Sequence, residues 1–418
     1  MLLAGIDWSD QALDYHLRTA GGRVLADGQV AVSPEGLAEL FVSLETHAPP
    51  DQIGIAIETA QGAWMQSLLD RGYRIYPVNP KAVERFREAM SANGDKSDRI
   101  DRRVLAMFLA VFHERLRPLK PDDPEIISLR IACQDRLRLV EERTAKLTEL
   151  GAILKVHYPA FGPLFGDLSS RVALEFLEQF PTQKQMQKLT GRRLRNWLRR
   201  QQYTCPQRID AMVAILKQPA LPVADHLQTV KAPLIQYLAS SLIALKAEIA
   251  QREEQITRQF EQLPEADWIG SLPGAGPNLR PALLACLGRD RDRFAATSDA
   301  QAFMGTAPVT KASGRSRSVK FRRGCWKFAR RTLQLFAEMS RRRCGWAQAF
   351  YHKQRASGHT HHQALRALAH KWLKILLAMQ RNGTPYNKAV FLNSQRAYLL
   401  KTPEIRTPAK AFFVAPLT

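Results

Sequence analysis

The chain has 418 residues, and its 61 Lys and Arg against 39 Asp and Glu give a formal net charge of +22. This length predicts two or three domains, and a hydrophobic fraction of 45% excludes a disordered chain. The excess of cations favours a polyanionic partner, with a membrane-surface or ribosomal protein as alternatives.

Targeting and redox signals are absent from the sequence. No apolar run is long enough to cross a membrane, and no basic and apolar leader precedes Leu2. The five cysteines form no CxxC pair, which fits a reducing compartment and argues against structural zinc. We therefore expect a cytoplasmic protein without membrane contact.

The first part of the chain combines strand and helix patterns. Strands are expected at 2–8, 13–19, 23–32, 53–58 and 73–78, and helices at 36–47, 63–71, 80–90 and from 98 onward. Three meandering strands followed by helix and strand in alternation predict an α/β domain with a mixed sheet, the element order of RNase H-like folds. In such a sheet the first and fourth strands are neighbours.

Four acids occupy informative places in this domain. Asp7 closes the first strand and Glu58 closes the fourth, so we expect them side by side. Asp98 and Asp101 lie three residues apart, on one face of a helix. Together the four carboxylates would supply the oxygen ligands that Mg²⁺ takes when it also binds phosphate. Singly, each acid could be an ordinary strand-end or helix-capping residue, so the prediction rests on their joint placement.

The middle of the chain is helical. Residues 124–157 and 230–263 have long amphipathic patterns, and the less regular stretch 158–228 between them carries the basic run Gly191–Arg200. This predicts an antiparallel, coiled-coil arm with an insertion. Dimerisation and the holding of a long nucleic acid both remain open as its role.

Two features of the last part suit phosphate binding. Gly274-Ala-Gly276 is a turn between helical segments, a helix-hairpin-helix-like signature whose amides could hold a backbone phosphate; a tight helix corner is the alternative. The segment 311–331 contains no acid and interleaves aromatics with cations, which predicts a nucleic-acid surface. Its cations are Lys311, Arg315, Arg317, Lys320, Arg322, Arg323, Lys327, Arg330 and Arg331.

A serine in this basic segment could attack a phosphodiester. Ser313 precedes Gly314 in a flexible turn, where neighbouring cations would stabilise an alkoxide and a pentacovalent phosphorane. Most serines in such a loop are turn residues. The chemistry of the sequence does not separate Ser313 from Ser316 or Ser318.

The motifs at both ends of the chain resemble those of the insertion-sequence one-ten family of transposases. Gly5-Ile6-Asp7 resembles the family's first acid motif, Ile57-Glu58-Thr59-Ala60-Gln61-Gly62 its second, and Lys96-Ser97-Asp98-Arg99-Ile100-Asp101 its Lys-Thr-Asp-x-x-Asp-Ala signature. Leu272-Pro273-Gly274-Ala275-Gly276 resembles its Pro-Gly-x-Gly motif, and Phe303-Met304-Gly305-Thr306-Ala307-Pro308 with Ser313-Gly314 its Gly-Leu-x-Pro and Ser-Gly pair. Ser97 stands where the family has Thr, and Arg102 where it has Ala.

The resemblance implies a RuvC-like DEDD domain joined to a serine transposase domain. It implies Asp7, Glu58, Asp98 and Asp101 as ligands of Mg²⁺ or Mn²⁺, and Ser313 as the nucleophile of a covalent phosphoserine link to DNA. The implied partners are donor and target DNA, a structured noncoding (bridge) RNA, and further copies of the chain in a dimer or tetramer. Action on DNA also implies association with the nucleoid. We therefore expect domains at 1–115 and 266–418, with the helical arm at 116–265 and its insert at about 158–228.

Two other functions are compatible with the residues alone. One is a RuvC-like junction endonuclease, in which water attacks the phosphodiester and Ser313 is only a loop residue. The other is a non-catalytic RNA- or DNA-binding protein that keeps the acids as remnants.

Overall fold

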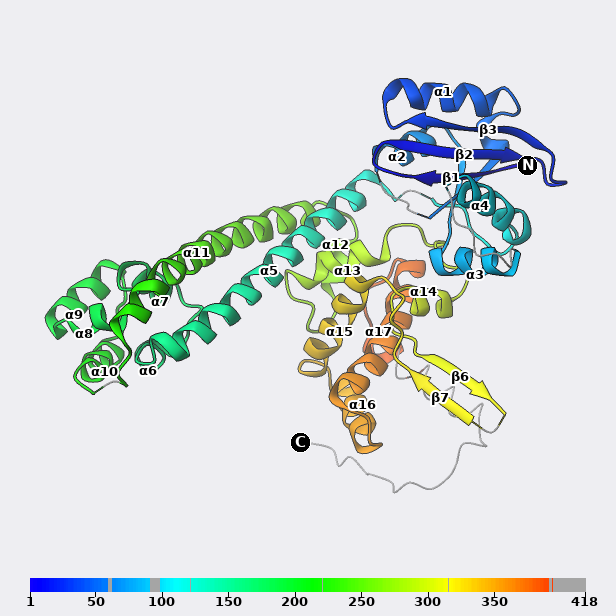
Figure 1. Ribbon diagram of the computed structural model, residues 1–418. Coiled ribbons are helices and arrows are strands. Elements are labelled where there is room, and N and C mark those ends of the chain that lie inside the picture. Colours follow the sequence, from blue (N-terminus) through cyan, green and yellow to red (C-terminus); the bar gives the residue numbers. More distant parts are fainter. Residues whose placement is uncertain are drawn as a thin grey trace. The chain divides into compact units, whose positions relative to one another are not determined.

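The computed structural model describes residues 1–58, 62–90, 98–120, 122–219, 221–314, 316–390 and 393, with the backbone alone at 63, 98, 99 and 317 (Figure 1). The motif residues Lys96 and Ser97, those at 59–61, and Arg315 lie outside the described residues. The chain forms two compact units, Met1–Pro121 and Asp122–Thr418. The division of the second unit into an arm and a C-terminal domain stays a prediction.

The first unit is built on a five-stranded mixed sheet of order β3-β2-β1-β4-β5. The strands are β1 (Leu2–Trp8), β2 (Ala12–Arg18), β3 (Val24–Ala31), β4 (Ile53–Ile57) and β5 (Arg74–Pro77). β1, β2 and β3 form an antiparallel meander, while β4 runs parallel to β1 and β5 parallel to β4. The prediction that the first and fourth strands are neighbours is confirmed by the pairing of Ile6 with Ile57.

Helices cover both faces of this sheet. Ala4 and Ile6 of β1 pack in a core with α1 (Pro34–Glu45) and α2 (Ala63–Asp70). Leu3 packs on the opposite face, in a core with α3 (Pro80–Met90) and α4 (Asp98–Phe112). The alternation of side chains along a strand thus assigns odd-numbered residues of β1 to the α4 face.

The backbone of α4 crosses β1 at Gly5. A Cβ atom at Gly5 would lie 2.1 Å from the carbonyl oxygen of Arg102 and 2.6 Å from the amide nitrogen of Ala106. Only a residue without a side chain permits this approach. Gly5 therefore sets how closely the start of α4 lies over the strand that ends in Asp7.

The second unit contains the two long helices predicted from the sequence, α5 (Pro124–His157) and α11 (Asp225–Glu261). Ile126 of α5 shares a core with Phe260 of α11, whereas Leu154 shares a different core with Leu238. The two helices are therefore antiparallel (Figure 1). Their arrangement as a coiled coil stays a prediction.

The stretch 158–228 is more regular than we expected. It contains α6 (Phe161–Phe165), α7 (Arg171–Gln179), α8 (Gln183–Gln187), α9 (Gly191–Arg200) and α10 (Pro206–Leu216). These helices pack with the C-terminal end of α5 and the N-terminal part of α11 in one hydrophobic core. Helices this short repeat too few apolar positions to give a strong periodic signal.

The remainder of the second unit is mainly helical, as predicted. It contains α12 (Ala266–Gly270), α13 (Leu279–Leu287), α14 (Thr297–Phe303), α15 (Lys327–Arg341), α16 (Gly345–Ala356) and α17 (His361–Asn382). Trp372 of α17 is fully buried, and its indole nitrogen donates a 2.7 Å hydrogen bond to the Ser340 hydroxyl. A hairpin of β6 (Val309–Ser313) and β7 (Ser316–Lys320) projects where the sequence predicted a basic turn. No helix in the described ranges is long and apolar enough to cross a membrane.

Candidate active site

Asp7 and Glu58 occupy the ends of two adjacent parallel strands. The register of β1 and β4 ends at Ile6 and Ile57, and the two acids are the residues that follow. Asp7 lies two residues beyond Gly5, on the face that α4 covers. Glu58 lies two residues beyond Ala56, whose side chain packs in the α4 core. The strands therefore bring both acids to the same edge and the same face of the sheet.

The two carboxylates differ in their surroundings. Asp7 is half-buried, and its Oδ1 accepts a 3.0 Å hydrogen bond from the amide of Trp8. Glu58 is exposed at the bend that follows β4. An acid with one face open to solvent and an amide fixing one of its oxygens suits metal ligation.

α4 carries the other two predicted acids. Residue 98 begins the helix, and Asp101 follows one turn later, immediately before the residue whose carbonyl lies over Gly5. The Asp101 Oδ1 forms a 2.8 Å ion pair with Nη1 of Arg87 from α3. Both side chains are 21% exposed.

The metal site itself stays a prediction. Within the described ranges, which omit the side chain at 98, no group of three or more His, Cys, Asp or Glu has an arrangement that could hold a metal ion. The placement of Asp7 and Glu58 beside the start of α4 nevertheless suits a divalent cation, because all the donors are hard oxygens. Arg87 occupies an oxygen of Asp101 that a metal would need.

A buried ionic network behind these acids was missed by the sequence analysis. Asp14 is directly opposite Asp7 in the β1–β2 register and is only 7% exposed. Arg102 of α4 donates to Asp14 at 2.6 Å and to Asp27 of β3 at 3.0 Å. His16 contacts Asp27 at 3.0 Å. The signal was present as charged residues inside the apolar strand 12–18, but their partners depend on the register.

The balance of forces in this network favours charged Asp27. Burial acts to raise the pKa of its carboxyl, but the hydrogen bond with His16 and the charge of Arg102 outweigh burial and lower it below the ordinary value of 3.8. The network ties α4 to β2 and β3. It therefore fixes the helix that carries Asp101 against the sheet that carries Asp7.

Ser313 is exposed at the end of β6, directly opposite Ser316 of β7. Gly314 follows with φ of +53°, a conformation that suits a two-residue hairpin turn. Register and alternation place Lys311 and Lys320 on the same face of the hairpin as Ser313. Ser316 and Ser318 share that face, so the geometry also does not single out Ser313.

The predicted nucleic-acid cations of this region fall into two groups. The exposed group has no acidic partner within the described part of the chain: Lys311, Lys320, Arg323 and Lys327. The second group makes contacts within the protein: Arg322 donates to the carbonyls of Ala307 and Pro308, Arg330 to that of Arg322, and Arg331 to Glu141. The side chains of Arg315 and Arg317 lie outside the described residues.

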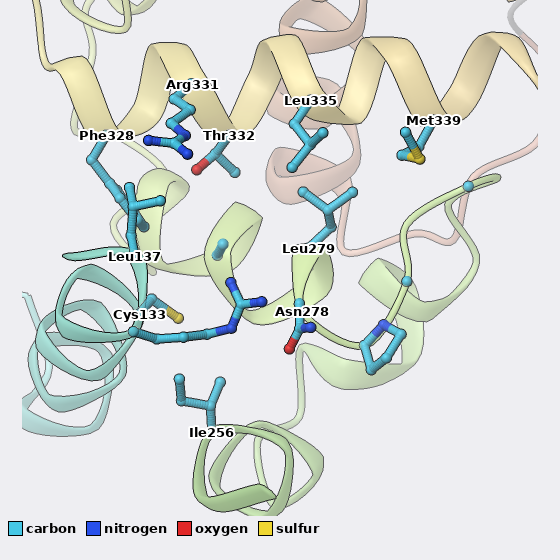
Figure 2. Close-up of a pocket in the computed structure, with 15 residues that line it drawn as sticks. Cys133, Leu137, Ile256, Asn278, Leu279, Phe328, Arg331, Thr332, Leu335 and Met339 are labelled. Atoms are coloured by element: carbon cyan, nitrogen blue, oxygen red, sulfur yellow. The ribbon is translucent and has the colours of Figure 1, made fainter. Parts of the chain in front are cut away.

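The glycine turn at 274–276 has a packing role. Gly274 has φ of +81°, and a Cβ there would lie 2.7 Å from the carbonyl oxygen of Met339 in α15. The turn also borders a cavity of about 340 Å³ between α5, α11, α13 and α15, which Figure 2 shows with Asn278, Leu279 and Leu335 among its lining residues. Phosphate binding by Gly274 and Gly276 stays a prediction.

This cavity is not an anion site. Most of its lining is apolar, including Cys133, Leu137 and Ile256 (Figure 2). Its two cations are both paired within the protein: Arg136 with Glu253, which also accepts a 3.0 Å hydrogen bond from Asn278, and Arg331 with Glu141. Ser313 is not among the residues that line it.

Two family models match the chain. A model described as "Transposase", for DEDD transposases of the IS110 type, matches residues 4–159. A second, described as "Transposase IS116/IS110/IS902 family", matches residues 266–352. The first match contains the four acid positions, and the second contains Ser313 and the glycine turn.

Curated relatives extend the likeness over most of the chain. The mini-circle protein of IS117 from Streptomyces coelicolor is 27% identical, with 89% of this chain and 92% of the relative covered. The 42 kDa protein of insertion element IS900 from Mycobacterium paratuberculosis is 28% identical, with 87% and 92% covered. The 44.8 kDa protein of insertion element IS116 from Streptomyces clavuligerus is 26% identical, with 87% and 92% covered. With both family models in chain order and relatives of matching length, this chain belongs to the IS110 family of transposases, enzymes that cut and rejoin DNA.

Proposed function

We propose that this transposase recombines DNA through a covalent phosphoserine intermediate on Ser313, assisted by metal-binding acids on a RuvC-like domain. The observation that carries the proposal is the convergence of Asp7, Glu58 and the start of α4 on one face of the sheet. The sheet order and the mixed strand directions are those expected of an RNase H-like fold.

The acids have a positioning and electrostatic role. Asp7, Glu58, Asp98 and Asp101 would hold Mg²⁺ or Mn²⁺, which when bound neutralises charge on the scissile phosphate. The Asp101 carboxylate is paired with Arg87, so a metal held by the same oxygen would replace this guanidinium. Loss of either helix acid strips charge from the site and cannot be compensated by an amide.

Ser313 supplies the nucleophile. Its Oγ forms a bond to the scissile phosphorus, the bond from phosphorus to the DNA leaving oxygen breaks, and the proton lost from Oγ balances the proton gained by the leaving hydroxyl. A free DNA hydroxyl then attacks the phosphoserine, which restores Ser313 and joins the new strand. Lys311 and Lys320, on the same hairpin face, stabilise the charge that develops on phosphorus oxygens.

The partners follow from the resemblance to the family. Donor and target DNA are the substrates, a structured noncoding RNA directs the choice of target by base pairing, and the active form is a dimer or tetramer. The net charge of +22 supports a polyanionic partner. It does not separate RNA from DNA.

The test is the capture of a covalent adduct between the chain and DNA that carries an element end, with the family's RNA and Mg²⁺ present. Ser313→Ala should abolish an adduct that survives denaturation. Ser316→Ala is the matched control, because Ser316 is directly opposite on the same hairpin face and should retain the adduct. Loss of the adduct in Ser316→Ala but not in Ser313→Ala would show that the nucleophile is Ser316 of β7 and not Ser313 of β6.

Two further results distinguish the other functions. Magnesium-dependent nicking without any adduct would identify a junction nuclease in which water attacks. Full cellular transposition by Asp7→Ala would identify the acids as remnants. Asp101→Asn should reduce adduct formation at least about 100-fold, whereas Asp51→Asn, an exposed acid in the same unit, should leave it unchanged.

A further inference from the structure

The insert between the two family matches is a folded body with its own core. Residues 160–265 lie outside both matches. Within this range α6 to α10 pack on the distal ends of α5 and α11, around the fully buried Phe176 and Leu177. A folded insert of this kind presents a fixed surface.

α9 is anchored in that core by one face. Leu194, Trp197 and Leu198 are buried, and the Trp197 ring lies edge-on to Phe176 with centroids 5.3 Å apart. A Cβ at Gly191 would lie 2.7 Å from Cγ1 of Val213, so the start of α9 is packed tightly against α10. The orientation of the helix, and hence of its outer face, is set by these contacts.

The outer face of α9 is a stripe of cations, which we call the α9 stripe. Its members are Arg192, Arg193, Arg199 and Arg200, all exposed. Within the part of the chain that the structure describes, none of the four pairs with an acid; the ion pair of this helix is that of Arg195 with Asp210, at 2.8 Å. Eight residues of helix span about 12 Å, which matches about three to four phosphates along one strand of a duplex.

Helix stability accounts for Arg199 and Arg200, whose charges favour the dipole in the last turn of α9, but not for the other half of the stripe. Arg192 and Arg193 occupy the first turn after the Thr190 cap, where their charge opposes the helix dipole. Some other exposed arginines of the second unit are neutralised within their own helix, as in the pairs Arg171–Glu175 and Arg258–Glu254. Among the residues that the structure describes, the α9 stripe has no such compensation, which leaves its charge available to an external polyanion.

We propose that the α9 stripe binds the phosphate backbone of double-stranded DNA, outside the site at which strands are cut. The proposal rests on DNA being the substrate of the proposed function. A duplex fits better than a single strand, because the exposed face of α9 carries no aromatic side chain on which bases could stack. Arginine and Asn196 contacts to phosphates read no sequence, so the stripe holds flanking DNA without specifying it.

The experiment measures the salt dependence of binding to a duplex of about 40 base pairs without an element end, using the full chain. In one variant all four arginines of the α9 stripe are replaced by Gln. In the control Arg138, Arg171, Arg252 and Arg258 are replaced by Gln, which removes the same charge from helices of the same unit where each arginine is paired with an acid. Paired variants, Arg192→Gln with Arg193→Gln and Arg199→Gln with Arg200→Gln, provide a milder change.

The expected result is a specific loss of salt dependence. The slope of log Kobs against log salt is negative, and its magnitude should decrease by about 0.9 for each phosphate contact removed. The decrease should be about 1.8 in each paired variant and up to about 3.6 in the fourfold variant. The control should change the slope by less than about 0.9. Equal slopes in the α9 and control variants would overturn the proposal, as would a change seen with an RNA duplex of the same length but not with DNA.

Unfolding followed by circular dichroism tests whether the variants remain folded. The paired Arg192 and Arg193 variant should be at least as stable as the wild type, because it removes cations from a helix N-terminus. The adduct assay separates this proposal from the proposed function. If the wild type forms no adduct but the α9 variants change the slope, only the recombinase mechanism is contradicted. If the wild type forms the adduct but the α9 variants leave the slope unchanged, only the proposal for the α9 stripe is contradicted.

Discussion

Arg102 of α4 forms a 2.6 Å ion pair with Asp14, the residue directly opposite Asp7 across β1 and β2. The pair is buried, with side chains 10% and 11% exposed. It joins the helix that carries Asp101 to the strand pair that carries Asp7. Arg102 is adjacent to Asp101 in the sequence, and Asp14 is the cross-strand neighbour of Asp7. Arg102 is therefore a positioning residue for the proposed acid site.

Removal of Arg102 should destabilise the first unit. Arg102→Ala leaves Asp14 buried without its cation and removes one of the two partners of the more exposed Asp27, which together costs about 3–5 kcal/mol. Hydrogen exchange of the β1 and β2 amides measures the free energy of opening in this unit. Arg103→Ala, an exposed neighbour on the same helix, should change it by less than about 0.5 kcal/mol. Similar values for the two variants would show that the ion pair contributes nothing to folding.

The pKa of Asp27 predicts a dependence of stability on acid. Its folded-state pKa lies below the ordinary value of 3.8, because His16 and Arg102 outweigh the effect of burial. A carboxyl of this kind contributes stability at pH values above its unfolded pKa, and that contribution is lost as the pH falls through the folded pKa. The free energy of opening of β2 and β3 should therefore decrease below about pH 4.

Asp27→Asn tests the assignment of this acid sensitivity. The variant should be less stable than the wild type at pH 7 and should lose less stability on acidification, since the titrating group is gone. Asp51→Asn, an exposed acid at the start of the turn before β4, should keep the wild-type acid profile. An unchanged profile in Asp27→Asn would place the acid sensitivity elsewhere.

Gly5 should not tolerate a methyl group. In Gly5→Ala the new Cβ would meet backbone atoms of Arg102 and Ala106 at 2.1 and 2.6 Å, and backbone cannot rotate away as a side chain does. Overpacking of this kind costs about 1–3 kcal/mol or more, and it displaces the start of α4. We expect reduced stability together with loss of adduct formation. Gly21→Ala, whose nearest atom outside the adjoining residues lies 4.0 Å away, should retain both.

The sequence predicted the elements that have clear boundary signals. β1, α3 and α5 begin and end where they were expected, because β1 is a continuous apolar run and each of the two helices begins at a proline. The β6–β7 hairpin was missed, because four of the five residues of β6 are exposed and the strand shows no apolar alternation. Its cationic sequence indicated a surface but not the strand pairing.

The site was predictable in part for a related reason. The adjacency of Asp7 and Glu58 follows from strand order alone, and strand order follows from the element pattern. The ion pairs of Asp101 and Asp14 depend on the rotation of α4 and on the exact register, which a single sequence does not determine. Only the resemblance to family motifs predicts Ser313 as the nucleophile, because neither cation density nor hairpin geometry distinguishes it from Ser316.

Arg87 should compete with metal for Asp101. The ion pair of 2.8 Å uses Oδ1 of Asp101, and both groups are largely shielded from solvent. A metal ligated by the same oxygen has to displace the guanidinium. Arg87→Gln removes the competing charge, so the Mg²⁺ concentration that gives half-maximal adduct formation should fall about two- to fivefold, the equivalent of about 0.5–1 kcal/mol for one partly exposed ion pair.

Two further variants of α3 test whether Arg87 competes with the metal. Arg85→Gln removes an exposed cation from the same helix, has no ion pair with Asp101 to release, and should leave the Mg²⁺ requirement unchanged. Arg87→Lys should lie between Arg87→Gln and the wild type, because lysine restores the charge without the planar guanidinium. If Arg87→Gln instead needs more Mg²⁺ and Arg87→Lys restores the wild-type requirement, then Arg87 holds Asp101 in the orientation that the metal uses. Competition would then be the wrong description of this pair.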